Sequence, residues 1–272
     1  MMGGMNDNRV ALVTGASSGI GKACAELLAA RGLRVYGTSR QQQPNGLFES
    51  LRMDVGDELS VNAAVASIVK REGRLDAVVN NAGIAIAGAI EDTSIAEARD
   101  QFEVNFFGVL RVCRAALPVL RDQRSGIIVN IGSIAGLLAV PYQGLYSASK
   151  FALEGMTESL RMEVAPFGVR VVVIEPGDHR TPLTENRRRT AGSLSSPVYR
   201  DRCDRAVARM AKDEQQGSEP EAAARLLYRV LNLPRPRIRY TVGPASERAA
   251  VWLKRLTPYT AVEKAMNAHY LC

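Results

Sequence analysis

Histidine and long apolar runs are scarce in this chain, and each shortage excludes a class of function. The 272 residues contain two histidines, His179 and His269, and four cysteines without metal-ligand spacing, which is too few for a standard zinc site. No run of about 18 apolar residues predicts a membrane span. The start, MMGGMNDNRV, also lacks the basic and apolar regions of a secretory signal. We therefore expect a metal-free, cytoplasmic protein whose cysteines are reduced and structural.

Aromatic residues are also few, and this bears on how the positive charge is interpreted. The net charge of +7 comes from the last third of the chain, where runs such as ENRRRT and PRPRIRY stand. Residues 178–272 carry 18 Lys and Arg against 10 Asp and Glu, whereas residues 1–177 carry 17 against 18. Acids are mixed with these bases, aromatic residues make up only 6%, and no nucleic-acid-binding motif is present, so solvated faces are favoured over nucleic-acid contact. An anionic carrier or a lipid head group stays open as a partner.

Apolar runs alternate with helical patterns along most of the chain. Because strand–helix alternation is typical of parallel sheets, the sequence predicts an α/β fold. We find no internal repeat, low-complexity tract or long linker, which favours one domain over residues 1–272. The predicted strands are 9–14, 33–37, 47–53, 75–80, 126–131, 169–174 and 237–242, and the predicted helices include 22–31, 58–71, 96–121 and 144–164.

A glycine turn follows the first apolar run, in the segment TGASSGIG. Gly15, Gly19 and Gly21 permit tight turning and close approach of a pyrophosphate, whose charge meets unpaired N–H groups at a helix start. Thr14 and the two serines of this segment add hydroxyls. The spacing differs from Gly-x-Gly-x-x-Gly, the commonest dinucleotide fingerprint. A purely structural turn is the alternative interpretation.

Tyr146 and Lys150 lie four positions apart in GLYSASKFALEGM, so they share one helix face. An ammonium beside a phenol favours the phenolate and lowers the tyrosine pKa toward neutrality, which suits an acid–base catalyst. The alternative is a solvated pair on an amphipathic helix.

Together, these motifs resemble the short-chain dehydrogenase/reductase family. The resemblance rests on TGASSGIG at 14–21, Asp54, NNAG at 80–83, Asn105, Ser133, Tyr146 with Lys150, and PGDHRT at 176–181, and it covers roughly residues 9–243. Hydroxysteroid/retinol dehydrogenase-like and 3-oxoacyl reductase-like members are the most similar. The resemblance implies a single-domain Rossmann-type fold, a doubly wound parallel sheet of about seven strands with helices on both faces.

The resemblance also implies hydride transfer between a nicotinamide cofactor and a carbonyl–alcohol pair. Tyr146 would act as general acid or base, and Ser133 would hydrogen-bond the reacting oxygen. Lys150 would lower the phenol pKa and hold the nicotinamide ribose, and Asn105 would hold a water linked to Lys150. Singly, Asn105 could merely interrupt an apolar helix and Ser133 could merely end a strand.

Ser39 and Arg40 follow the second predicted strand, at the position where an NAD-binding chain would place a carboxylate. A basic side chain there pairs with the extra phosphate of NADP, so Arg40 favours NADP(H). Asp54 would bind the adenine amino group or instead cap the next helix, and Asn80 would brace neighbouring strands. The expected cofactor residues are Gly15, Ser17, Ser18, Gly19, Ile20, Gly21, Arg40, Asp54, Asn81, Gly83, Tyr146, Lys150, Pro176, Gly177 and Thr181.

The substrate is expected to lie under a lid at about 178–218 that has its own helical piece near 198–212. A long lid suggests a sizeable lipophilic ketone, aldehyde or alcohol. His179 replaces an aromatic residue common in the family, and it either packs or contacts substrate. Alternatives are a 3-oxoacyl thioester reductase, a non-catalytic NADP(H) sensor and a sugar-nucleotide epimerase.

Two further surfaces are expected to make contacts. The tail at about 246–272 would pack an amphipathic face on the domain, or dock on a membrane through Trp252, Leu253 and Leu256 beside Lys254 and Arg255. Family resemblance implies a homodimer or homotetramer paired through the helices near 96–121 and 144–164.

Overall fold

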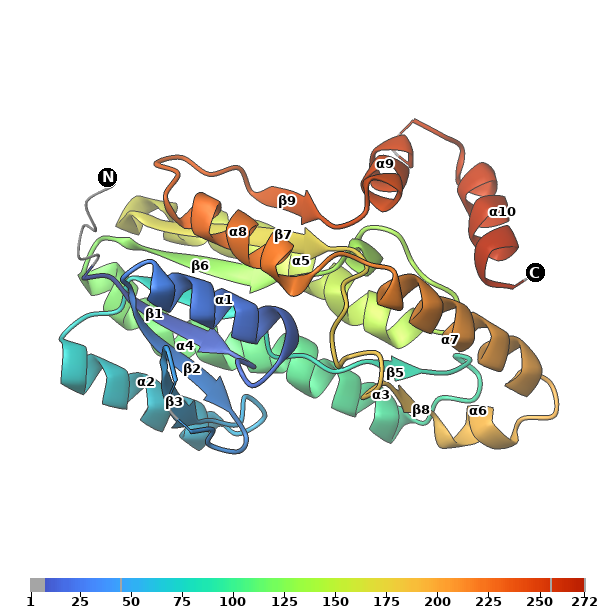
Figure 1. The fold of residues 1–272 in the computed structure, drawn as a ribbon, viewed down its shortest axis with the longest axis horizontal. Coiled ribbons are helices and arrows are strands. Elements are labelled where there is room, and N and C mark those ends of the chain that lie inside the picture. The colour runs from blue at the N-terminus through green and yellow to red at the C-terminus, as the bar shows by residue number, and fades with distance from the viewer. Residues whose placement is uncertain (1–7, 45, 255, 272) are drawn as a thin grey trace.

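A seven-stranded parallel sheet forms the centre of the molecule (Figure 1). The computed structural model describes residues 8–44, 46–254 and 256–271. The strand order is β3-β2-β1-β4-β6-β7-β9, which places the carboxyl ends of β1, β4 and β6 side by side. The strands are β1 Val10–Thr14, β2 Arg34–Ser39, β3 Glu49–Arg52, β4 Ala77–Asn80, β6 Gly126–Ile131, β7 Val169–Pro176 and β9 Arg239–Val242.

Helices cover both faces of this sheet. Successive apolar residues of a strand point to opposite faces, so both faces are apolar and both must be covered. Val10 and Leu12 of β1 face one core cluster and Ala11 and Val13 face the other. The first cluster packs on α2 Glu58–Glu72, α4 Gly108–Asp122 and α5 Gly144–Val164, and the second on α1 Gly19–Ala30 and α8 Pro220–Leu231.

The seven predicted strands and the doubly wound fold are confirmed, with boundaries that differ by a few residues. The helix expected over 96–121 is confirmed as one continuous helical run, but the π-helical turn within it was not predicted. That segment is α3 Ile95–Phe102, a π-helical turn at Glu103–Phe107 and then α4. The sequence analysis also missed a small parallel pair, β5 Ile86–Ala87 with β8 Arg188–Arg189, because two-residue strands are too short to show a period.

The segment after β7 crosses the carboxyl end of the sheet before the chain returns through α8 and β9. It contains β8, α6 Ala191–Ser195 and α7 Arg200–Gln215. The helical piece expected near 198–212 is therefore confirmed as α7. The backbone of His179 forms an isolated bridge with Ser218, which ties the start of this segment to its end.

The tail forms two helices, α9 Ala245–Leu253 and α10 Tyr259–Tyr270, which project from one end of the sheet in Figure 1. Val251 is buried, but Trp252, Leu253 and Leu256 are 60%, 48% and 67% exposed. Val251 thus packs on the domain, as expected for an amphipathic face, whereas these three side chains are exposed to solvent. No helix in the described ranges is long and apolar enough to cross a membrane. Cys24, Cys113 and Cys203 are free and buried, while Arg255 and Cys272 lie outside the described residues.

Two short 3-10 turns complete the scaffold near the end of β6 and before β7. They are η2 Ile134–Gly136 and η3 Ala165–Phe167. The η2 turn packs against α5, and it follows directly on Ser133. The end of β6 is thereby held against the helix that carries Tyr146 and Lys150.

Candidate active site

The glycine turn between β1 and α1 is shaped to receive a phosphate. Gly15 and Gly19 adopt φ angles of +66° and +55°, which favour glycine. Gly21 has no room for a side chain, because an added Cβ would lie 2.2 Å from the Gly15 carbonyl oxygen and 2.3 Å from Asn81 Nδ2. Ser18 precedes α1 without a side-chain capping bond, so the first N–H groups of the helix stay available to an anion. These residues fit the pyrophosphate of a dinucleotide.

The NNAG loop after β4 locks this turn in place. Asn81 Nδ2 donates to the carbonyl oxygens of Thr14 and Gly15 at 3.0 and 3.1 Å. Thr14 Oγ1 accepts from the backbone N–H groups of Asn81 and Ala82, both at 3.0 Å. In the neighbouring strand pair, Asn80 Nδ2 donates to Asn130 Oδ1 at 2.9 Å, which confirms the bracing role expected for Asn80. The shape of the phosphate turn therefore depends on side chains about 65 residues away along the chain.

One cavity of about 1320 Å³ brings most of the predicted site residues together. It runs from the glycine turn past Arg40 and Asp54 to Tyr146 and the segment after β7. Gly21 and Asn105 are the predicted residues that do not line it, and they support the wall from behind. The predicted residues in its lining are Gly15, Ser17, Ser18, Gly19, Ile20, Arg40, Asp54, Asn81, Gly83, Ser133, Tyr146, Lys150, Pro176, Gly177 and Thr181.

Asp54 does not cap the helix after β3, so that alternative is wrong. Asp57 is the N-cap of α2, and its side chain accepts from the Leu59 N–H at 2.9 Å. Asp54 Oδ1 accepts instead from the Gly56 N–H at 2.9 Å, and the residue lines the cavity near Arg40. Its position next to the second strand is compatible with a contact to the adenosine end of a nucleotide.

Tyr146, Lys150 and Ser133 meet at the buried wall of the cavity. The Ser133 hydroxyl lies within hydrogen-bonding reach of the Tyr146 phenol. Lys150 Nζ lies 5.8 Å from the centre of the Tyr146 ring and donates to the Ile131 carbonyl oxygen at 2.9 Å. Tyr146 is 9% exposed and Lys150 6%. A phenol, a hydroxyl and an amine thus converge where a carbonyl oxygen can be met by two hydrogen-bond donors.

The electrostatics of this wall differ from the sequence-based expectation. Burial raises the pKa of Tyr146 to about 12, and the hydrogen bond with Ser133 offsets only part of that rise. Burial also lowers the pKa of Lys150 to about 8. Lys150 therefore does not bring the phenol near neutrality in this structure. The phenol therefore carries its proton at neutral pH, the form that can donate to a carbonyl oxygen.

Asn105 lies in the π-helical turn between α3 and α4, a kind of distortion that is frequent at functional sites. Its Oδ1 accepts from the Ile84 N–H at 2.9 Å, and its Nδ2 donates to the Ile84 carbonyl oxygen at 3.1 Å. Nδ2 also lies 3.2 Å from Ser149 Oγ on α5. Asn105 thereby holds the segment after Gly83 against α5, while a role in holding water next to Lys150 stays a prediction.

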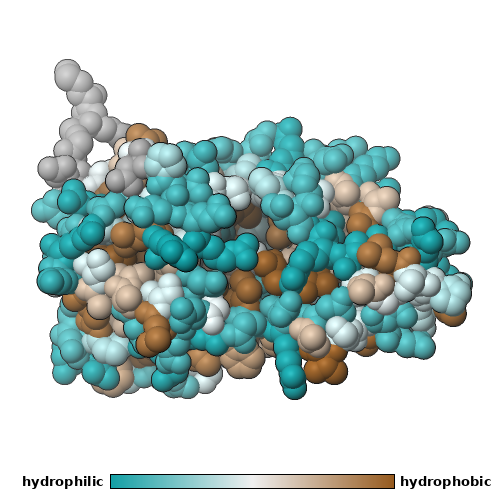
Figure 2. Space-filling model, turned by 90° about the horizontal axis from the view of Figure 1, so that it is seen from below, coloured by the Kyte–Doolittle hydropathy of each residue, from teal (hydrophilic) through white to brown (hydrophobic). Residues whose placement is uncertain are grey.

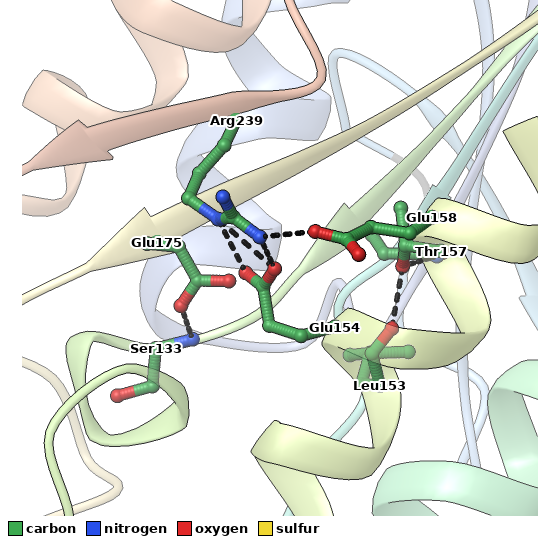
Figure 3. A network of polar contacts seen from close by, with 8 residues as sticks. Ser133, Leu153, Glu154, Thr157, Glu158, Glu175 and Arg239 are labelled. Carbon is green, nitrogen blue, oxygen red and sulfur yellow. Dashed lines mark hydrogen bonds and ion pairs between the residues drawn. The ribbon is translucent and has the colours of Figure 1, made fainter.

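Glu175, which the sequence analysis did not single out, supports Ser133 from behind. It is fully buried, and its Oε2 accepts from the Ser133 N–H at 2.5 Å (Figure 3). Its side chain lies beside that of Glu154 and interacts with it electrostatically. Arg239 Nε contacts the Glu154 carboxylate at 3.1 and 2.9 Å. Arg239 Nη2 reaches Glu158 at 2.9 Å. These side chains come from α5, β7 and β9, so only the fold brings them together.

The two carboxyl groups of this network share one proton. Burial and the neighbouring Glu154 raise the pKa of Glu175 well above its usual range. Burial would also raise the pKa of Glu154, but the contacts with Glu175 and Arg239 outweigh it and lower that pKa. Glu175 is thus the neutral partner and Glu154 the ionised one.

We expect Glu175→Gln to keep the network, because a glutamine amide can accept from Ser133 and donate to Glu154. In the wild type, folded Glu175 keeps its proton while unfolded Glu175 loses it above about pH 4.3. Wild-type stability therefore falls as pH rises from that value toward the folded pKa, and the variant lacks this loss. The difference in melting temperature, variant minus wild type, should therefore increase by at least about 2 °C from pH 5 to pH 8. Glu158→Gln, at an exposed member of the network, is the control. If the difference in melting temperature from wild type were independent of pH for both variants, a neutral Glu175 would be contradicted.

The other end of the cavity is lined by polar groups of the segment after β7 and of the tail. His179 is 4% exposed, and its Nδ1 donates to the Gly177 carbonyl oxygen at 2.9 Å. Glu247 of α9 accepts from the Asp178 N–H at 2.9 Å, and burial together with Glu247 raises the pKa of Asp178 to about 8. The sequence offered no signal for Glu247, which lies 69 residues from Asp178. Figure 2 shows that apolar side chains also reach the surface among hydrophilic ones on the face seen from below.

Comparisons with known proteins agree with this geometry. The sequence pattern of the short chain dehydrogenase family matches residues 9–192. The 3-ketodihydrosphingosine reductase of Bacteroides thetaiotaomicron is 39% identical over 263 residues, which cover 96% of this chain and 98% of that protein. An NADPH-dependent 3-dehydrocapnine reductase of Ornithobacterium rhinotracheale is 35% identical, covering 87% of this chain and 88% of its own. The crystal structure of a short-chain dehydrogenase from Streptomyces avermitilis is similar with a TM-score of 0.82 and 33% identity, over 95% of this chain and 96% of that chain.

Proposed function

Because the chain belongs to the short-chain dehydrogenase/reductase family, we propose that it reduces a long-chain aliphatic ketone to its alcohol with NADPH. Members of this family use a nicotinamide cofactor. The observation that carries the proposal is the protonated, buried phenol of Tyr146 beside the Ser133 hydroxyl on the wall of a large cavity. A proton donor and a second hydrogen-bond donor are what carbonyl reduction requires at the reacting oxygen.

Each residue at the reacting centre has one task in this proposal. The cofactor, when bound, supplies the hydride. Tyr146 gives its phenolic proton to the carbonyl oxygen, and Ser133 holds that oxygen by a hydrogen bond. Lys150 holds the ribose next to the nicotinamide. Glu175 fixes the Ser133 backbone, and Asn105 fixes the segment after Gly83, so that the donors stay aligned.

The protonation state of Tyr146 favours the reduction step at neutral pH. Alcohol oxidation needs the phenolate as a base, and burial raises the pKa of this phenol to about 12. Reduction uses the protonated form, which is the dominant one at neutral pH. An oxidation rate at pH 7 equal to the reduction rate, measured at saturating cofactor, would contradict this direction.

An aliphatic lipid ketone is the substrate class that the relatives and the cavity support together. Two relatives are named for reducing 3-ketodihydrosphingosine and 3-dehydrocapnine, the second with NADPH. 3-Ketodihydrosphingosine is a long-chain ketone with a polar amino alcohol end. The cavity offers a matching polar region at Asp178, His179 and Glu247. A 3-oxoacyl thioester reductase is the runner-up, and a non-catalytic NADP(H) sensor is disfavoured by the complete set of donors.

A substrate panel tests this function. Purified protein with NADPH is offered 3-ketodihydrosphingosine, a 3-oxoacyl thioester, a ketosteroid and retinal, and the loss of NADPH absorbance is followed. We expect the highest kcat/KM for the aliphatic amino ketone. A higher kcat/KM for the thioester would support the runner-up instead. Tight NADPH binding without turnover of any carbonyl would support the sensor.

Arg40 is expected to select NADPH over NADH. Arg40 is exposed at the carboxyl end of β2 and lines the cavity, so its guanidinium can bind the extra phosphate. Arg40→Ala should lower kcat/KM with NADPH by about 10- to 100-fold and leave kcat/KM with NADH almost unchanged. Arg52→Ala, at an exposed arginine on neighbouring β3, is the matched control. Equal efficiencies with both cofactors, unchanged by Arg40→Ala, would remove this assignment.

We also propose a homodimer or homotetramer that pairs through α4 and α5. Phe107, Leu110 and Phe151 of this region are 43%, 36% and 41% exposed, and this apolar surface supports the proposed pairing. Sedimentation should give twice or four times the monomer mass.

Peripheral membrane contact of the tail is supported by exposed Trp252, Leu253 and Leu256, and failure to co-sediment with anionic vesicles at low salt would dispose of it.

A further inference from the structure

Arg187, in the segment after β7, is a buried cation with unused hydrogen-bond donors. Its side chain is 2% exposed, and the residue lines the large cavity. One nitrogen, Nη2, pairs with Glu214 Oε1. The other two, Nε and Nη1, are buried and have no hydrogen-bond partner.

A short chain of contacts holds this guanidinium in place. Glu214 of α7 accepts from the Thr184 hydroxyl at 2.7 Å through its second oxygen, Oε2. Both oxygens of the carboxylate are thus engaged, one by Thr184 and one by Arg187. The guanidinium is therefore anchored at Nη2, and Nε and Nη1 remain for another group.

Arg187 also lies close to the reacting centre. Its positive charge lowers the pKa of Tyr146, and the charge of Glu214 raises it. Arg187 makes the smaller of these two contributions, and both residues line the same cavity as Tyr146. A group bound by Arg187 would therefore be near the carbonyl that Tyr146 protonates.

Buried arginine nitrogens are rarely left without partners, because each unpaired N–H group costs free energy. Departures from this rule cluster at functional sites, where a ligand completes the set. A guanidinium binds planar or paired oxygens in preference to other groups. The ligand that fits is an oxygen acceptor.

We propose that Arg187 binds a hydroxyl or anionic oxygen on the polar end of the substrate, next to the ketone. This inference rests on the proposed function and makes it more specific. Arg187 is then the residue that selects lipid ketones with a polar head over plain alkyl ketones. A substrate without this oxygen leaves the buried Nε and Nη1 of the guanidinium unpaired, and this is the source of the selection.

A matched pair of ketones tests the proposal. 1-Hydroxyoctadecan-3-one carries the oxygen and octadecan-3-one lacks it, while the chain length is the same. We expect wild type to prefer the hydroxy ketone. Arg187→Met should lower kcat/KM for the hydroxy ketone by about 10- to 100-fold and leave that for the plain ketone and the affinity for NADPH unchanged. An equal loss for both ketones, or weaker NADPH binding, would overturn the proposal.

Two further variants make the result interpretable. Arg187→Met combined with Glu214→Gln avoids a buried unpaired carboxylate, and it should show the same loss of preference if the single variant folds poorly. Arg180→Met is the matched control, because Arg180 lies in the same segment, is 53% exposed and pairs with Glu219. The control should keep the wild-type preference.

A binding measurement separates this proposal from the proposed function. If wild type reduces neither ketone, the proposed function fails, and titration with octadecane-1,3-diol and octadecan-3-ol then decides the role of Arg187. Tighter binding of the diol, lost in Arg187→Met, would support the contact. Equal binding of both alcohols by wild type would overturn it.

Discussion

Replacing Tyr146 with Phe should lower carbonyl reduction by at least about 100-fold, the usual scale of general-acid catalysis. The change removes one hydroxyl and keeps the ring that packs against Ala85 and Ala135. Burial raises the pKa of this phenol to about 12, so the protonated form is present over the whole working range of pH. The Ser133 hydroxyl beside it is a much weaker acid and cannot replace the phenol as the proton donor. The loss should appear in kcat rather than in the affinity for NADPH.

Tyr142→Phe is the matched control for this result. Tyr142 lies four residues before Tyr146 and is absent from the lining of the cavity, so the same loss of a hydroxyl should leave turnover nearly unchanged. Steady-state kinetics with NADPH and the best ketone of the panel give the comparison, and thermal melting checks that both variants fold. Near-normal turnover of Tyr146→Phe would refute the role of Tyr146 as proton donor.

The local features of this protein could be predicted from the sequence because neighbouring residues carry their signals. Apolar runs predicted the seven strands of the sheet, and the glycine turn follows directly on β1. Tyr146 and Lys150 are one helical turn apart on α5, so their common face followed from spacing alone. The motifs that came from family resemblance also converge on one cavity.

Features that depend on burial and on distant charges could not be predicted in this way. The spacing of Tyr146 and Lys150 suggested a lowered tyrosine pKa, but both side chains are buried and burial outweighs the amine. The network of Glu154, Glu175 and Arg239 joins residues separated by up to 85 positions. Sequence spacing contains no information on such contacts before the fold is known.

The π-helical turn at Glu103–Phe107 is a further case. The apolar pattern over 96–121 is helical throughout, and one extra residue in a turn hardly changes that pattern. The tertiary contact of Asn105 with the Ile84 backbone accompanies the distortion and was invisible in the sequence. The distortion within the predicted helix therefore lies at a residue for which the family resemblance implies a catalytic role.

Gly21→Ala should both destabilise the fold and weaken the binding of the dinucleotide. A Cβ at this position would lie 2.2 Å from the Gly15 carbonyl oxygen and 2.3 Å from Asn81 Nδ2. The carbonyl belongs to the backbone of the phosphate turn, and the amide is the group that locks this turn to the NNAG loop. Neither can move without opening the cradle. We expect a loss of about 1–3 kcal/mol in the free energy of unfolding, as for other overpacked sites, and a melting temperature lower by roughly 3–10 °C.

Gly155→Ala separates the steric effect from the general effect of alanine in a helix. Gly155 lies within α5, and an added Cβ would meet no atom within 4 Å. Alanine there should stabilise the single chain by about 0.5–1 kcal/mol, because it lowers the entropy of the unfolded chain. Gly155 shares a helix face with Phe151 of the proposed interface, so sedimentation must show that the variant keeps the wild-type assembly. In thermal melts, the melting temperature should fall for Gly21→Ala and rise for Gly155→Ala. In NADPH titrations, the affinity should be lower for Gly21→Ala alone. If both variants gained stability and bound NADPH like wild type, the turn would not be the rigid phosphate cradle that its contacts with Asn81 indicate.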